Sequence, residues 1–276
     1  MAQQDVKTQR DPSSGGDPLP AEASEAVARE LRRRLLPQPY RSIVALTTAA
    51  AILLAVNQLF NLQLIGFALL DPQYLYVLSL LFLCVTFLAF PAWKGAPMDR
   101  VPWYDALLSL ISVGVVAYFV LNAERALMLG WEYGAPQTAF YFSVAFWLLI
   151  LEGARRTGGL VIFLVVLLFS LYPIVADRVP GPIQGFPSSF YDTVVFHVIS
   201  SESALGIPMR SFGQLVVGFI LFGATLQFTG GGKFFIDLAF ALLGKVRGGP
   251  AKVSIFSSGL MGSMSGSVVT NVLTTS

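Results

Sequence analysis

Charge is scarce in this sequence. Asp, Glu, Lys and Arg together make up 12% of the 276 residues, whereas a soluble domain carries about a quarter. Hydrophobic residues make up 55%, and the mean hydropathy is +0.68. This composition excludes an ordinary soluble domain and indicates an integral membrane protein. The net charge is only +2 and the positive residues cluster between apolar runs, so nucleic acid is not an expected partner.

Cysteine and histidine are almost absent. The single cysteine, Cys84, lies in the apolar run LSLLFLCVTFLAF, which excludes an intramolecular disulfide and a cysteine-based metal site. The single histidine, His197, lies outside the apolar runs. We expect it to be a surface residue, and a proton relay with Asp192 and Glu202 is the alternative.

Catalytic and nucleotide-binding motifs are also missing. The stretch GSMSG has Met264 where a nucleophile elbow needs serine, and Phe234 follows Lys233 where a phosphate loop needs Ser or Thr. An intramembrane serine protease would need a base at membrane depth, where the sequence offers none. We therefore expect no enzyme and no cofactor, and energy would come from an ion gradient.

Long apolar runs, by contrast, are abundant. A helix needs about 20 apolar residues to cross a hydrocarbon core about 30 Å thick. Because backbone amides find no water there, each run should be helical. The predicted fold is all-α: a polytopic transmembrane helical protein with interfacial helices. Six runs qualify, namely residues 42–64, 74–91, 106–123, 136–151, 158–176 and 211–230.

The distribution of Lys and Arg predicts the orientation. With six spans and the N-terminus in the cytoplasm, all but three of the 18 Lys and Arg residues fall on the inner side. The three on the outer side are Arg125, Arg178 and Arg210. We expect residues 1–41 to be a disordered cytoplasmic tail ending in a basic amphipathic helix. In the outer loop 177–210, we expect a helix at the membrane surface.

The last part of the chain is uncharged yet polar. Residues 253–276 carry no charge, and more than half of them are Ser, Thr, Gly or Asn. Such groups are costly in hydrocarbon unless they are buried in protein or line a watery cavity. After a predicted interfacial helix over 234–243, we interpret 254–276 as the first arm and tip of a re-entrant hairpin whose oxygens bind Na⁺. Close helix packing through small residues, such as Gly259 with Ser263, is the alternative.

The motif block FFIDLA, RGGPAKV and GSMSGSVVTNV resembles the membrane component of tripartite ATP-independent periplasmic (TRAP) transporters, in the form that fuses the small and large membrane subunits. The resemblance starts at Phe212. It implies elevator-type sodium symport of organic acids across the bacterial inner membrane, with a periplasmic substrate-binding protein as partner. The residues that match the family's sodium and substrate loop are Ser263, Ser265, Gly266, Ser267, Thr270 and Asn271, and Ser263, Ser265, Ser267 and Asn271 would hold the Na⁺.

The resemblance also divides the chain. Residues 42–157 would form a four-helix domain like the small subunit, 158–210 a linker helix with the outer segment, and 211–276 the start of the large-subunit transport domain. A complete permease has further spans and a second hairpin, so the chain is expected to be a fragment that works with the remaining part of the permease. Two alternative functions stay open: a non-transporting membrane scaffold with small-residue packing, and an intramembrane hydrolase.

Overall fold

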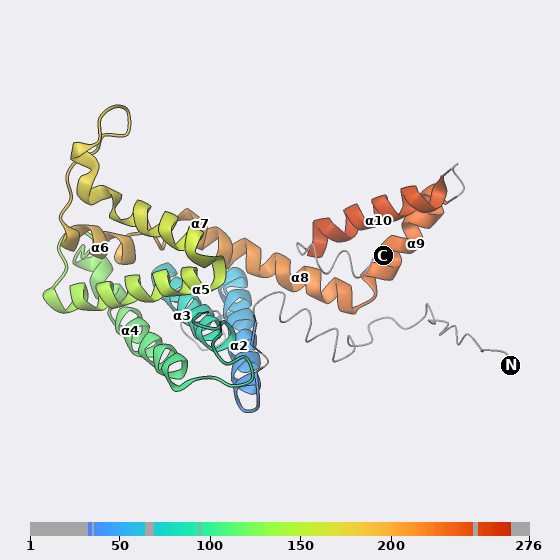
Figure 1. Cartoon of the computed structure of the whole chain (residues 1–276), viewed down its shortest axis with the longest axis horizontal. Coiled ribbons are helices and arrows are strands. Elements are labelled where there is room, and N and C mark those ends of the chain that lie inside the picture. The colour runs from blue at the N-terminus through green and yellow to red at the C-terminus, as the bar shows by residue number, and fades with distance from the viewer. Residues whose placement is uncertain (1–32, 35, 64–68, 94, 245–247, 266–276) are drawn as a thin grey trace. The chain divides into compact units, whose positions relative to one another are not determined.

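The computed structural model describes residues 33–265 except 35, 64–68, 94 and 245–247 (Figure 1). The described residues form helices and no strands, which confirms the predicted all-α fold. They fall into two compact units, one over residues 22–217 and one that includes 218–276. In chain order the helices are α2 (Tyr40–Phe60), α3 (Asp71–Ala89), α4 (Trp103–Met128), α5 (Gln137–Val175), η1 (Ala176–Arg178), α6 (Phe190–Ile199), α7 (Ile207–Ser211), η2 (Phe212–Val216), α8 (Val217–Phe228), α9 (Gly231–Leu243) and α10 (Gly249–Ser265).

Prolines mark where several of these helices begin. Pro72 occupies the first turn of α3, and Pro102 and Pro136 directly precede α4 and α5. Proline suits these positions because the first N–H groups of a helix have no partner within the helix and the ring presets a helical φ. The starts of three apolar helices are therefore encoded locally.

Among the described residues, five helices are long and apolar enough to cross a membrane, where the sequence predicted six. The difference lies in α5, which contains both the fourth and the fifth predicted runs. A straight helix of 39 residues would extend about 58 Å, nearly twice the hydrocarbon core. However, α5 doubles back on itself in Figure 1, where a light green limb is followed by a yellow-green limb that returns beside it. Both predicted runs are thus helical, and no separate loop joins them.

The reversal in α5 occurs at a pair of glycines. Gly159 has φ 79° and ψ −175°, a conformation that essentially only glycine adopts without strain. A Cβ atom on the preceding residue, Gly158, would lie 2.8 Å from the Ile162 side chain. The sequence ARRTGGL therefore encodes a sharp reversal at this point, where composition alone suggested a polar loop.

Helix α3 lies at the centre of the first unit. Tyr74, Leu78 and Phe87 are fully buried and pack with Val116 and Phe119 of α4 and with Phe146 of α5. Two hydroxyl groups on α3 extend the contacts to later segments. Tyr74 Oη donates to the carbonyl oxygen of Gly213 in η2 at 2.7 Å, and Tyr76 Oη donates to that of Val198 in α6 at 3.0 Å. Polar side chains at the core thus fix the outer segments to the bundle.

The shorter predicted helices are present. The helix expected within 177–210 is α6, which packs on α5 and buries Val194, Val195 and Val198. Ser189 starts it by accepting a hydrogen bond from the Asp192 N–H group. The helix predicted over 234–243 corresponds to α9. The tail and the basic amphipathic helix predicted over 1–41 fall almost entirely outside the described residues.

Candidate functional site

The predicted ion site belongs to the unit that holds α9 and α10, which lie side by side (Figure 1). Gly248, with φ +78°, precedes α10, in agreement with the chain break that the sequence predicts before Pro250. The described part of α10 has 17 residues and spans about 26 Å, slightly less than a hydrocarbon core. The buried non-glycine residues of the described parts of α9 and α10 are Ala239, Val253 and Ser257.

The structure places only part of the predicted site. Ser263 and Ser265 lie in the last turn of α10, two residues apart along the backbone. Gly266, Ser267, Thr270 and Asn271 lie outside the described residues. Whether these six residues surround an ion, and whether α10 is the first arm of a hairpin, therefore stay predictions.

The serines and glycines of α10 do not all mediate packing. Ser257 is buried, and its Oγ donates to the carbonyl oxygen of Ser254 at 3.2 Å, so this hydroxyl is satisfied within the helix. A Cβ atom on Gly259 would meet nothing within 4 Å. Within the described residues, Gly259 thus makes no close contact with another helix, and the packing alternative stays open.

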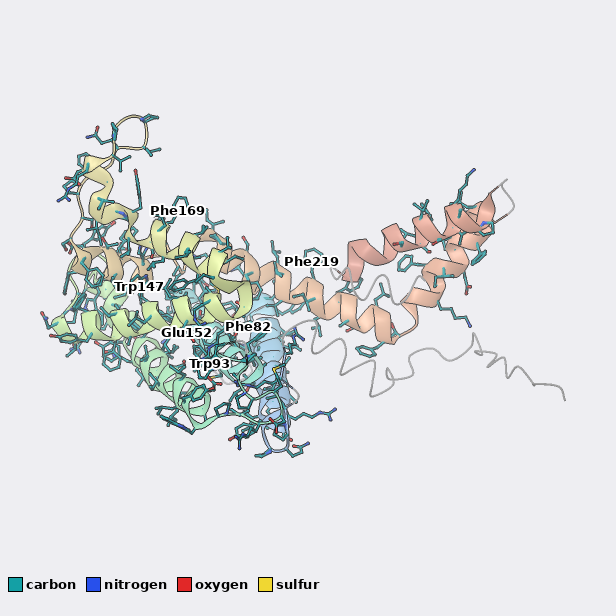
Figure 2. All side chains as sticks on the ribbon, in the orientation of Figure 1. Phe82, Trp93, Trp147, Glu152, Phe169 and Phe219 are labelled. Carbon is teal, nitrogen blue, oxygen red and sulfur yellow. The ribbon has the colours of Figure 1, made fainter. Side chains whose placement is uncertain are left out.

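A cluster of charged residues, which we call the arginine network, occupies one end of the first unit. It contains Arg34, Asp105, Glu152, Arg155 and Arg156, and Figure 2 labels Glu152. Arg156 Nη1 donates to Asp105 Oδ1 at 2.6 Å, and Arg156 Nε donates to Glu152 Oε1 at 2.7 Å. Arg155 makes two bonds to the same Glu152 carboxylate, at 2.7 and 2.8 Å. The two carboxylates are therefore shared by adjacent guanidinium groups.

Arg34 completes the arginine network from the N-terminal side. Its Nη2 atom lies 2.6 Å from Asp105 Oδ2, an ion-pair distance without hydrogen-bond alignment. The side chains of Arg34 and Asp105 are completely buried, and that of Arg156 is almost so. Buried charges of this kind persist only when they are paired and bonded, because desolvation is costly.

The arginine network also satisfies backbone carbonyl groups at the end of α3. Arg34 donates to the oxygens of Leu88 and Pro97, Arg156 to that of Phe90, and Arg155 to that of Ala92. The last carbonyls of a helix lack partners within the helix and carry partial negative charge. Arg34 and Arg156 therefore cap the end of α3, and the bonds to Ala92 and Pro97 hold the connection after it.

The charge count placed these three arginines on the inner side, with Arg34 in the predicted amphipathic helix, and missed both acids. The spacing of Glu152, Arg155 and Arg156 at i, i+3 and i+4 signals a local pair on one helix face. No local pattern marks Asp105, because its partners come from the N-terminal segment and from α5. Among the described residues, there is no cluster of His, Cys, Asp and Glu suited to a metal ion.

A small cavity lies toward the opposite end of α3 and α4. Its volume is about 90 Å³, and Tyr76, Glu132, Ser201 and Arg210 contribute its polar lining. The volume matches about three water molecules. The Nε atom of Arg210 is buried and has no hydrogen-bond partner among the described residues. The cavity thus has both charge signs in its wall and suits water better than a transported solute.

His197 is more enclosed than the sequence predicted. Its side chain is half-buried, with Nδ1 2.7 Å from Ser203 Oγ and Nε2 2.8 Å from the Ser170 carbonyl oxygen. The Ser170 contact requires Nε2 to donate, so in the neutral ring Nδ1 accepts from Ser203. Asp192 instead bonds Ser189 at the start of α6. His197 therefore joins α6 to the returning limb of α5, and the expected free surface position is wrong.

Five apolar helices of spanning length, with charged residues concentrated at helix ends, define a multi-pass α-helical membrane protein. Residues 145–276 match the family model of the tripartite ATP-independent periplasmic transporter, DctM component, so this part of the chain is similar to that family. Neither the curated proteins nor the solved structures contain a match. The family is one of transporters, so the hydrolase alternative is set aside.

The matched region extends well upstream of Phe212, where the sequence resemblance starts. It includes Glu152, Arg155 and Arg156, whereas Arg34 and Asp105 precede it. The arginine network therefore joins the DctM-type region to the part of the chain before it.

Proposed function

We propose that this chain is the membrane permease of a sodium-coupled secondary active transporter that takes up organic acids with the help of a periplasmic substrate-binding protein. The observation that carries the proposal is the DctM match over residues 145–276, which includes the uncharged, hydroxyl-rich segment after Lys252. The tripartite family supplies the expected partners. The substrate class and the coupling ion follow from the resemblance of the motif block.

We further propose a division of labour along the chain. Residues 42–157 would act as a small-subunit-like scaffold fused to the large subunit, 158–210 as the linker, and 211–276 as the first part of a mobile transport domain. The separation into two compact units near residue 217 supports this division. Elevator transport requires that one unit move while the other stays fixed. The N-terminus is proposed to lie in the cytoplasm.

The proposed Na⁺ site is built from the segment that follows the described part of α10. Hydroxyl and amide oxygens of Ser263, Ser265, Ser267 and Asn271 would replace the hydration shell of the ion, and Gly266 would let the backbone turn. Thr270 would line the same loop. Broken helices in secondary transporters provide such sites because helix C-terminal ends and freed carbonyl groups carry partial negative charge. Because residues 253–276 carry no charged side chain, no ion pair within this segment would compete with the bound cation.

Transport assays test this proposal. The chain would be reconstituted with the remaining permease and the binding protein in liposomes, and organic acid uptake would be followed with inward gradients of Na⁺ or K⁺. We expect uptake with Na⁺ only, and Ser267→Leu or Asn271→Leu to abolish it. Ser254→Ala serves as the control, because Ser254 is exposed on α10 outside the motif. Unchanged uptake by both loop variants would refute the proposed site.

A further inference from the structure

Four arginines converge on the short segment that follows α3. Three of them, Arg34, Arg155 and Arg156, donate to carbonyl oxygens of residues 88–97. The fourth, Arg33, places its guanidinium 5.8 Å from the centre of the Phe90 ring. Arg33 and Arg155 thus lie over the same few residues, since Phe90 contacts one and Ala92 accepts from the other.

The positive charge in this cluster exceeds the negative charge. Asp105 and Glu152 are fully engaged, because each of their four oxygens contacts Arg34, Arg155 or Arg156. Three guanidinium groups therefore share two carboxylates, and Arg33 adds a second uncompensated charge. Arg33 has no ion pair or hydrogen bond within the described part of the chain, and its side chain is exposed.

Arg155 also keeps a free donor group and is partly exposed. The Arg155 side chain is 32% exposed, and its Nη1 group makes no hydrogen bond to a described residue. A guanidinium group recognises phosphate through paired N–H donors. The guanidinium groups of Arg33 and Arg155, which lie over the same segment, therefore suit the oxygens of a phosphate group and not a metal ion or a neutral solute.

The surroundings indicate that this phosphate belongs to a lipid. Trp93 is 56% exposed and stacks on Tyr104, with the ring centres 5.3 Å apart, and Trp103 is 78% exposed. Exposed tryptophans at helix ends favour the level of the lipid headgroups. In α4, Trp103 is followed by the exposed residues Leu107, Leu110 and Ile111, which lie closer to the middle of the helix. A phospholipid placed here would set its acyl chains against these residues and its phosphate at the arginines.

From these contacts we infer that Arg33 and Arg155 form a binding site for the headgroup phosphate of an anionic phospholipid at the arginine-network end of the bundle. The surplus positive charge gives anionic lipids an advantage over zwitterionic ones, whose ammonium group would meet the same guanidinium groups. The inference does not depend on the coupling ion, the substrate or the transport mechanism.

Native mass spectrometry of the purified full chain tests the site. Phosphatidylglycerol and phosphatidylcholine with identical acyl chains would be added in competition, and the ratio of bound lipids measured. Arg33→Gln removes one exposed guanidinium without touching the buried ion pairs, and we expect it to reduce the preference for phosphatidylglycerol about fivefold. The matched control is Arg125→Gln, an exposed arginine near the opposite end of α4, which should leave the preference unchanged.

Two results would overturn the inference. Equal losses in Arg33→Gln and Arg125→Gln would show that only the overall charge of the protein matters. Arg33-dependent binding of inorganic phosphate without any preference between phosphatidylglycerol and phosphatidylcholine would identify a free anion as the ligand instead of a lipid. Thermal unfolding of both variants in the same detergent checks that they are folded, and equal midpoints are expected because both side chains are exposed.

Discussion

The carboxylate of Asp105 lies 2.6 Å from the guanidinium group of Arg156, and both side chains are shielded from solvent. Asp105 lies in the first turn of α4, whereas Arg156 lies three residues before the reversal in α5. The pair therefore fixes the position of that reversal relative to the start of α4, and Arg34 fixes the N-terminal segment to the same carboxylate.

Asp105→Asn should destabilise the protein strongly. The substitution leaves the buried Arg34 without its counter-ion and Arg156 with Glu152 alone, and breaking a buried ion pair by removing one partner costs about 3–5 kcal/mol. Thermal unfolding in detergent measures the effect, with Asp99→Asn as the control because Asp99 is exposed in the same connection. If Asp105→Asn unfolds at the wild-type temperature, the ion pairs do not hold this end of the bundle together.

Gly159→Ala should also be destabilising, for a backbone reason. The φ of 79° and ψ of −175° at Gly159 place any side chain in a strained region, which costs about 1–3 kcal/mol. Gly114→Ala provides the contrast, because a Cβ atom there meets nothing within 4 Å and alanine favours a helix interior by about 1 kcal/mol. Opposite shifts of the unfolding midpoint are expected, and equal shifts would contradict the assigned reversal.

Tyr74→Phe isolates one bond between α3 and η2. Loss of the hydroxyl leaves the buried Gly213 carbonyl without this donor, at a cost of about 1–3 kcal/mol. Tyr133→Phe should change stability little, since Tyr133 is largely exposed. Unfolding midpoints report on both variants. A Tyr74→Phe protein as stable as Tyr133→Phe would mean that the bond contributes nothing to the packing of η2.

Sodium should stabilise the protein if the proposed ion site exists. A ligand that binds only the folded state raises stability by mass action, by about 2.7 kcal/mol at a concentration one hundred times its dissociation constant. We expect the unfolding midpoint to rise with NaCl more than with KCl, and Asn271→Leu to remove the difference. Identical midpoints in the two salts would favour a scaffold in which the small residues only pack helices.

Much of the fold is predictable from sequence because the information is local. The apolar runs gave the positions of α2, α3 and α4, and the break at Gly248 and Pro250 gave the start of α10. The reversal in α5 was harder to predict, because EGARRTGG reads as a polar loop until the backbone conformation of Gly159 is known. A count of charges places Arg34 and Arg156 on the inner side of the membrane and does not indicate that they are buried. Their burial depends on Asp105, which reaches them only after the helices pack.

His197 illustrates the same limit at a single side chain. Its distance from the apolar runs suggested a surface position, and nothing in its neighbourhood signals Ser170, which precedes it on another helix. Local sequence decides which segments are helical. Contacts between segments decide which polar side chains are enclosed.

The reversal of α5 at Gly159 occurs without a loop, and this limits the insertions and deletions that the sequence can accept there. An ordinary loop accommodates an extra residue by changing its conformation, but here the helix resumes directly after Gly159. Each residue inserted between Arg156 and Leu160 would therefore rotate the returning limb by about 100° about its axis. Ser170 would swing away from His197, and the face of the limb now packed on α6 would turn outward. This junction should thus tolerate substitutions by glycine better than any change in length.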